Sequence, residues 1–175
     1  MRDDVDRILD QWAAERPDLD ASPMGIIGRI ARLSRSHARS IGATLAHHDL
    51  QRDEFDVLAT LRRSGPPYRL TPTQLRGSMM ITSATMTHRL DKLEQRGLIS
   101  RQPDPSDRRG LLIGLTAEGR TLVDRALDDH VANEHRLLAS MSPRDRAHLA
   151  SLLRRLMVAG NRPADEDEEP PPPGR

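Results

Sequence analysis

A helical run with a polar side is the first segment whose residue types could do specific chemistry. Between residues 82 and 96, Met86, Leu90 and Leu93 recur at helical spacing, so this side is expected to face a core. The opposite side carries small and hydrogen-bonding residues, which could contact base edges in a DNA major groove. The predicted DNA contacts are Ala84, Thr87 and His88 at the bases, with Ser83 and Thr85 nearer the phosphates.

Two adjacent arginines form a second candidate site. The turn-forming segment PDPSDRR separates two runs suited to strands, 98–102 and 110–115, and therefore predicts a hairpin. We expect Arg108 and Arg109 at its tip, with Asp107 folding the turn and orienting an arginine. Arginine is attracted to the negative potential of a DNA minor groove. Both candidate sites also fit a plainer interpretation, in which they are solvated surface charges.

Helices must position these groups. We expect helices at 3–15, from an N-cap at Ser22 to about Leu45, at 51–63, from Thr71 for about two turns, from Thr82 or Ser83 to Arg96, at 116–140 and at 143–159. Residues 68–70 form a short extended piece, and Gly97 is placed as a left-handed helix terminator. Helix, turn and helix followed by a hairpin is a winged helix-turn-helix arrangement. The predicted class is mainly α with a small β-hairpin wing.

The terminal helices carry more apolar surface than one small lobe can cover. The helices at 3–15, 116–140 and 143–159 each have an apolar stripe. Surplus apolar surface predicts a partner, here a homodimer. A two-fold dimer would place its recognition helices ~34 Å apart and would need a pseudo-palindromic operator in double-stranded DNA.

Composition narrows the function classes. The chain has no cysteine, no HExxH, no Gly-rich phosphate loop and no Gly-x-Ser-x-Gly, so we expect neither an enzyme nor a cofactor or metal site. It has no apolar stretch of about 20 residues and its N-terminus is charged, so we expect a cytoplasmic protein without a membrane span. Five acids at 165–169 precede a proline run, which predicts a disordered tail over 161–175.

Residues 81–120, ITSATMTHRLDKLEQRGLISRQPDPSDRRGLLIGLTAEGR, resemble the recognition helix and wing of the MarR (multiple antibiotic resistance regulator) family. The resemblance extends over 20–160 in the order of the helices. It implies a homodimer that usually represses transcription and releases DNA on binding a small, often aromatic anion. It also implies that Asp107 orients the wing, that Arg109 enters the minor groove and that residues 83–88 face the major groove.

A narrower resemblance concerns the extra N-terminal helix. Gln11-Trp12, followed by ERPDLDASPMGIIGRIARL, is similar to a branch of the family that responds to urate and related organic anions. This similarity implies an anion pocket lined by Trp12, Asp56, Arg89 and either Arg101 or Arg63, with urate, xanthine or a phenolic carboxylate as ligand. Arg89 lies about 60° from the buried stripe of its helix, so it could point into a cleft behind the DNA-reading side.

Two alternatives stay open. His130 and Glu134, four residues apart and beside His135, could make a metal-sensing regulator. The chain could also be a dimeric protein-interaction module that does not bind DNA. The predicted organisation is N-terminal helices for dimerisation and one pocket wall (1–50), a DNA-binding lobe (51–115), C-terminal dimerisation helices (116–160) and the tail (161–175).

Overall fold

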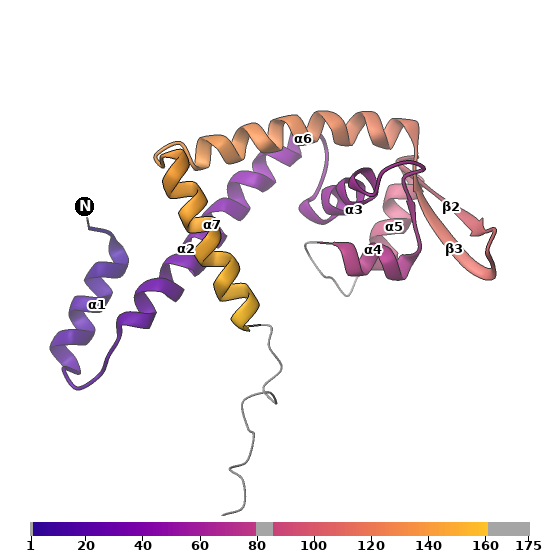
Figure 1. Ribbon diagram of the computed structural model, residues 1–175. Coiled ribbons are helices and arrows are strands. Elements are labelled where there is room, and N and C mark those ends of the chain that lie inside the picture. The colour runs from indigo at the N-terminus through magenta and orange to yellow at the C-terminus, as the bar shows by residue number, and fades with distance from the viewer. Residues whose placement is uncertain (1, 80–85, 161–175) are drawn as a thin grey trace, which may run out of the picture. The chain divides into compact units, whose positions relative to one another are not determined.

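The computed structural model describes residues 2–79 and 86–160, without the side chains of Arg108 and Arg109 (Figure 1). The predicted helix cap at Thr82 or Ser83, the predicted contacts Ser83, Ala84 and Thr85, and the tail from residue 161 lie outside the described residues. The chain forms two units, residues 1–134 and 135–175. Within the described part of the chain, no helix is long and apolar enough to cross a bilayer.

The elements confirm the predicted fold class. They are α1 (Asp4–Glu15), α2 (Ser22–Ala46), α3 (Arg52–Arg63), β1 (Arg69–Leu70), α4 (Pro72–Ser78), α5 (Met86–Gln95), β2 (Ile99–Asp104), β3 (Asp107–Leu115), α6 (Ala117–Leu137) and α7 (Pro143–Gly160). The strands form one antiparallel sheet in the order β1-β3-β2. The helices α4 and α5 with this sheet make the expected winged helix-turn-helix lobe.

Local chemistry sets several helix ends where the sequence predicts them. Thr71 and Gln74 form a reciprocal capping box at the start of α4, in which each side chain accepts the other's backbone N–H. After α5, Gly97 adopts a φ of +68°, which only glycine adopts freely, and its N–H donates to Glu94 O at 2.8 Å.

Two boundary predictions are wrong. Ser22 is already the first residue of α2, and the cap position is Ala21, whose side chain cannot accept a hydrogen bond. The hairpin is longer than predicted, because β3 begins at Asp107 and its pairing with β2 continues to Asp104. Asp107, Arg108 and Arg109 therefore lie in the strand beside the turn, whereas the sequence placed them in the turn.

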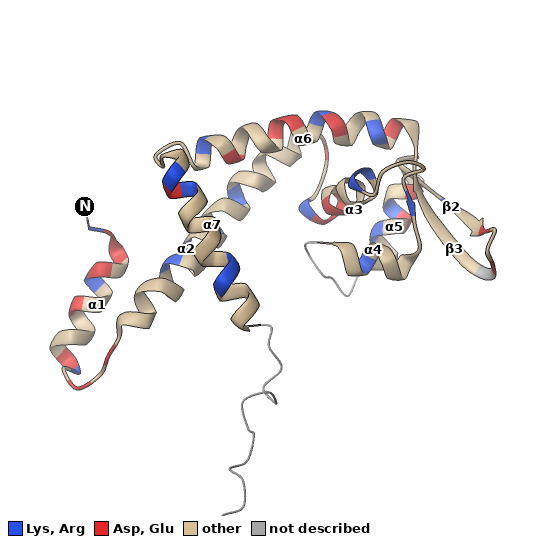
Figure 2. Cartoon of the chain, viewed as in Figure 1, with Lys and Arg blue, Asp and Glu red and all other residues tan. Residues whose placement is uncertain are grey.

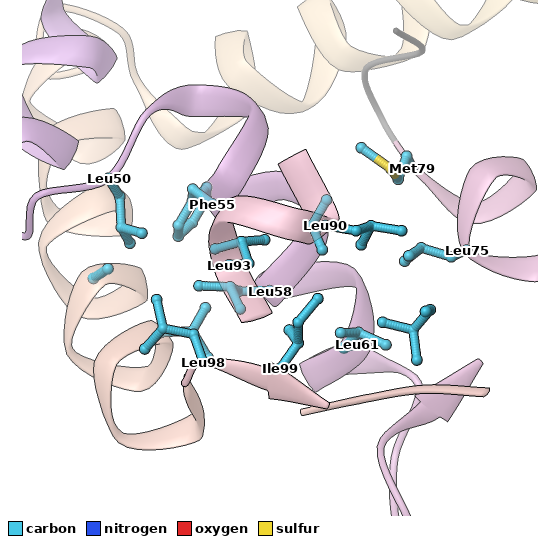
Figure 3. Close-up of a cluster of buried hydrophobic side chains, with 14 of the residues drawn as sticks. Leu50, Phe55, Leu58, Leu61, Leu75, Met79, Leu90, Leu93, Leu98 and Ile99 are labelled. Carbon is cyan, nitrogen blue, oxygen red and sulfur yellow. The ribbon is translucent and has the colours of Figure 1, made fainter. Parts of the chain in front are cut away.

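The core lies where α3, α4, α5 and the sheet meet, and the start of α6 adds to it (Figure 3). Its fully buried members include Leu58 and Leu61 of α3, Leu93 of α5 and Ile113 of β3. Aliphatic side chains of this size stabilise a fold by roughly 1.5–3 kcal/mol each when fully buried. The apolar residues on the inner side of α3 and just before it are all buried, namely Leu50, Val57, Leu58 and Leu61.

The joint between the sheet and α6 is closely packed. Gly119, in the first turn of α6, lies so near the Leu98 carbonyl that an added Cβ would stand 2.0 Å from its oxygen. The same carbonyl accepts the N–H of Thr116 at 3.2 Å. Glycine is therefore required at residue 119.

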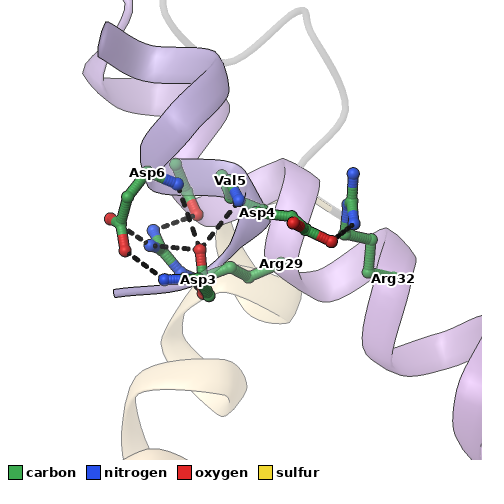
Figure 4. A network of polar contacts seen from close by, with 7 residues as sticks. Asp3, Asp4, Val5, Asp6, Arg29 and Arg32 are labelled. Carbon is green, nitrogen blue, oxygen red and sulfur yellow. Dashed lines mark hydrogen bonds and ion pairs between the residues drawn. The ribbon is translucent and has the colours of Figure 1, made fainter. Parts of the chain in front are cut away.

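The N-terminal helix α1 is attached to α2 by complementary charge and by the burial of Val5. Most charged residues of α1 are acidic, whereas those of α2 are all basic (Figure 2). Arg29 of α2 donates to Asp3 at 2.8 Å and to Asp6 at 2.6 Å, and Val5 is buried between the two helices (Figure 4). Arg32 makes a further ion pair with Asp4 at 3.2 Å.

We predict that acid detaches α1 from α2. The Arg29 guanidinium lowers the pKa of Asp3, and the backbone N–H of Asp3 together with Arg29 lowers the pKa of Asp6. Since these pKa values are lower in the docked state, the stabilisation is complete above the ordinary carboxyl pKa of about 4 and is lost as the pH falls through the lowered values.

Trp12 is the single tryptophan and lies on α1, so its emission should report this transition. Asp3→Asn should start the change at higher pH. Emission that stays constant down to the pH of global unfolding, followed by circular dichroism, would contradict the prediction.

Candidate nucleic-acid interface

Helix α5 has the two-sided character that groove recognition requires. Met86, Leu90 and Leu93 are buried in the core, as predicted. Thr87 and His88 are exposed on the other side. A helix held by one buried stripe presents its opposite side as a rigid surface, which is the geometry of a recognition helix.

The hairpin formed by β2 and β3 lies beside α5. It follows α5 in the chain, as the wing does in a winged helix-turn-helix. Its turn is folded by Asp104, whose Oδ1 accepts the N–H of Ser106 at 2.8 Å and its hydroxyl at 2.6 Å. These hydrogen bonds lower the pKa of Asp104. Asp104 therefore helps to fold the turn, and Asp107 is exposed at the start of β3, where its predicted role in orienting an arginine stays a prediction. Arg108 and Arg109 follow directly in that strand.

Arg101 of β2 joins the wing to the recognition helix. Its Nη2 lies 2.6 Å from Asp91 Oδ1 and its Nη1 lies 2.7 Å from Glu94 Oε2. The Arg101 backbone N–H also donates to Glu94 at 3.2 Å. Asp91 and Glu94 thus hold the planar guanidinium of Arg101 between two carboxylates, which links β2 to α5.

Three cations of the recognition helix segment are bound by acids of one neighbouring stretch, residues 49–54. Arg89 Nε lies 2.6 Å from Asp53 Oδ2, and Lys92 Nζ lies 2.8 Å from Glu54 Oε1. Arg96 reaches Glu54 at 3.4 Å and Asp49 at 3.3 Å. We call these ion pairs the α3–α5 clamp.

Glu54 is the buried centre of the clamp, with a side chain only 3% exposed. Burial by itself raises the pKa of a carboxyl group. Here the N–H of Gln51, the ammonium of Lys92 and the charge of Arg96 outweigh burial, so the pKa of Glu54 lies below its ordinary value. Glu54 therefore stays charged at neutral pH.

Arg89 lines a cavity of about 330 Å³ together with Gly42, Leu50, Gln51, Arg52 and Asp53. Its side chain is 16% exposed, and its Nη1 is buried without a hydrogen-bond partner. The structure therefore places Arg89 at a cavity, while its predicted role as an anion ligand stays a prediction.

The other predicted anion ligands lie elsewhere in the chain. Asp56 and Arg63 line a separate cavity of about 370 Å³ that includes His130. Arg101 is engaged with the recognition helix, and Trp12 on α1 is 39% exposed. The predicted set is thus divided among different places of one chain.

His130, the proposed metal ligand, contacts Glu134 at 3.2 Å. Among the described residues there is no group of three or more His, Cys, Asp or Glu side chains suited to a metal ion.

Asp53 and Glu54 were missed by the sequence analysis. A signal was present, because Gln51 and Glu54 form a capping box and acids are favoured in the first turn of a helix. Their second role depends on α5, about 35 residues later in the chain, which local spacing does not reveal.

Comparison with known proteins gives the family. The family model described as "MarR family" matches residues 50–111. The HTH-type transcriptional regulator PecS of Dickeya dadantii is 43% identical over 153 residues, which cover 87% of this chain and 92% of PecS.

Solved structures agree in fold. Sco3205 of Streptomyces coelicolor, a MarR family transcriptional regulator in complex with DNA, has a TM-score of 0.72 at 22% identity, and the match covers 85% of this chain and 96% of Sco3205. BpsR of Bordetella bronchiseptica, whose DNA binding is regulated by 6-hydroxynicotinic acid, has a TM-score of 0.67 at 25% identity, with 74% and 91% covered. The chain therefore belongs to the MarR family of DNA-binding transcription regulators and is not an enzyme.

Proposed function

We propose that the protein binds a pseudo-palindromic operator as a homodimer and represses transcription until a small organic anion binds. The observation that carries the proposal is the exposed Thr87 and His88 side of α5, followed by a hairpin that bears Arg108 and Arg109. In this proposal residues 51–115 are the DNA-binding lobe, and the helices in 1–50 and 116–160 form the dimer.

Exposed apolar side chains support the dimer. In α2, Ile26, Ile27 and Leu33 are more than half exposed, at 62%, 58% and 52%. In α7 no residue is buried, although Leu152 and Leu156 belong to an apolar stripe. Exposed stripes of large apolar side chains are typical of helices that pack against a partner.

Sedimentation equilibrium should therefore give twice the 19.6-kDa chain mass. Replacing Leu152 and Leu156 together by Glu should produce monomers, because a charge in an apolar interface is costly to desolvate. Ser151→Glu is the control, since Ser151 lies about 100° from Leu152 and about 140° from Leu156 around α7 and so points away from both. A monomeric wild-type protein would overturn the proposed assembly.

DNA binding can be tested by electrophoretic shift with the DNA that flanks the gene. Arg109→Ala should weaken binding with little change in base preference, whereas Thr87→Ala or His88→Ala should cost about 1–3 kcal/mol and alter the preferred bases. Binding should fall steeply with salt. If no duplex shifts at low salt, the alternative of an interaction module that does not bind DNA is favoured.

The Arg89 cavity supports the response to an anion. A planar carboxylate could accept hydrogen bonds from the guanidinium, including the unpartnered Nη1, and compete with Asp53 for it. Because Arg89 belongs to the recognition helix, an anion there would act directly on the element that reads DNA. BpsR is a family member whose DNA binding responds to such a compound, 6-hydroxynicotinic acid.

Titration with urate, xanthine or salicylate should show saturable binding by calorimetry and should release bound DNA. Arg89→Gln should weaken both effects at least about tenfold, the cost of losing a charge-assisted hydrogen bond. Arg76→Gln removes the same charge from exposed α4 and serves as the control. If none of the three anions binds or releases DNA, this ligand class is excluded.

A further inference from the structure

We propose that Glu54 is a positioning residue for DNA recognition, whose buried carboxylate holds the cations of the recognition helix away from DNA phosphates. The inference rests on the DNA binding proposed above. It gives a function to the α3–α5 clamp, which contains no predicted DNA contact.

The basic side chains of the recognition helix segment are paired with protein carboxylates. Over residues 86–96 the basic side chains other than His88 are Arg89, Lys92 and Arg96, and each one is paired with an acid of residues 49–54. Helices that read DNA commonly use lysine and arginine for phosphate contacts, which add affinity for every sequence. In this chain protein carboxylates compete with phosphates for those cations.

The Glu54 carboxylate contacts two cations and one backbone N–H at the same time. One carboxylate receives Lys92 at 2.8 Å, Arg96 at 3.4 Å and the N–H of Gln51 at 2.9 Å. The hydrogen bond from Gln51 fixes the carboxylate to the start of α3. The two cations are therefore bound by a carboxylate with a fixed position. Because the Glu54 side chain is 3% exposed, water screens these contacts little.

Release of Lys92 from Glu54 would change how the helix binds DNA. Lys92 is half exposed and lies about 40° around the helix from His88, so a freed ammonium group could reach a nearby phosphate. Loss of the Glu54 charge should therefore release cations that bind any DNA, while the helix loses part of its fixed orientation. The result is weaker discrimination together with stronger non-specific binding.

Glu54→Gln tests this inference, because glutamine keeps the shape and can still accept the Gln51 N–H but lacks the charge. The probes are a duplex selected by the wild-type protein from a random library and a scrambled duplex of the same composition. We expect the ratio of their Kd values to fall about tenfold, and binding to the scrambled duplex to gain roughly one to two units of salt slope. A folded variant with unchanged ratio and slope overturns the proposal.

Asp129→Asn is the matched control, since it removes one negative charge from an ion pair with His48 that does not involve α5. Its scrambled-duplex slope and its discrimination ratio should equal those of the wild type. An equal effect of both substitutions would show that overall charge acts, and it would overturn the role of Glu54.

Lys92→Gln decides the matter if Glu54→Gln does not fold, because Lys92 is half exposed and its replacement leaves Glu54 paired with Arg96. We expect a lower discrimination ratio without stronger scrambled-duplex binding. Equal weakening on both duplexes would identify Lys92 as a simple phosphate contact and overturn the proposal. If the wild-type protein selects no sequence, the proposed function itself fails, which is a distinct result.

Discussion

The burial of one side of α5 is the constraint on which the winged helix-turn-helix lobe depends. Met86, Leu90 and Leu93 enter the core made by α3, α4 and the sheet, and this packing fixes which side of the helix remains outside. A rotation of one residue would move the helix surface by 100° and would bury polar groups without partners. The apolar core therefore sets the identity of the exposed residues before any DNA is present.

Electrostatic contacts further restrict the orientation of α5, which the apolar core sets only approximately. Arg101 connects the wing to Asp91 and Glu94, while the α3–α5 clamp connects α5 to Asp53 and Glu54. Apolar packing is non-directional, whereas paired guanidinium and carboxylate groups favour particular geometries. The recognition helix is thus held between charged contacts on two sides, one to the wing and one to α3.

Local patterns predicted the elements well, because the signals act within a few residues. The Thr71 capping box and the Gly97 terminator are examples, and the apolar period of α5 identified its buried side. The hairpin turn was harder to predict, because Asp104 and Asp107 both suit a turn. Only the strand register shows which of the two lies before the turn and which lies after it. The partners of Arg89 and Arg101 were beyond local reasoning, since an ion pair between distant segments leaves no spacing pattern.

The glycine at residue 119 has a mechanical consequence. The first turn of α6 and the Leu98 carbonyl are in close contact, so neither can move without the other. Leu98 lies between the end of α5 and the start of β2. A shift of that turn must carry the base of the wing with it, since there is no intervening side chain to deform. A movement of α6 would consequently be transmitted to the hairpin through this rigid contact.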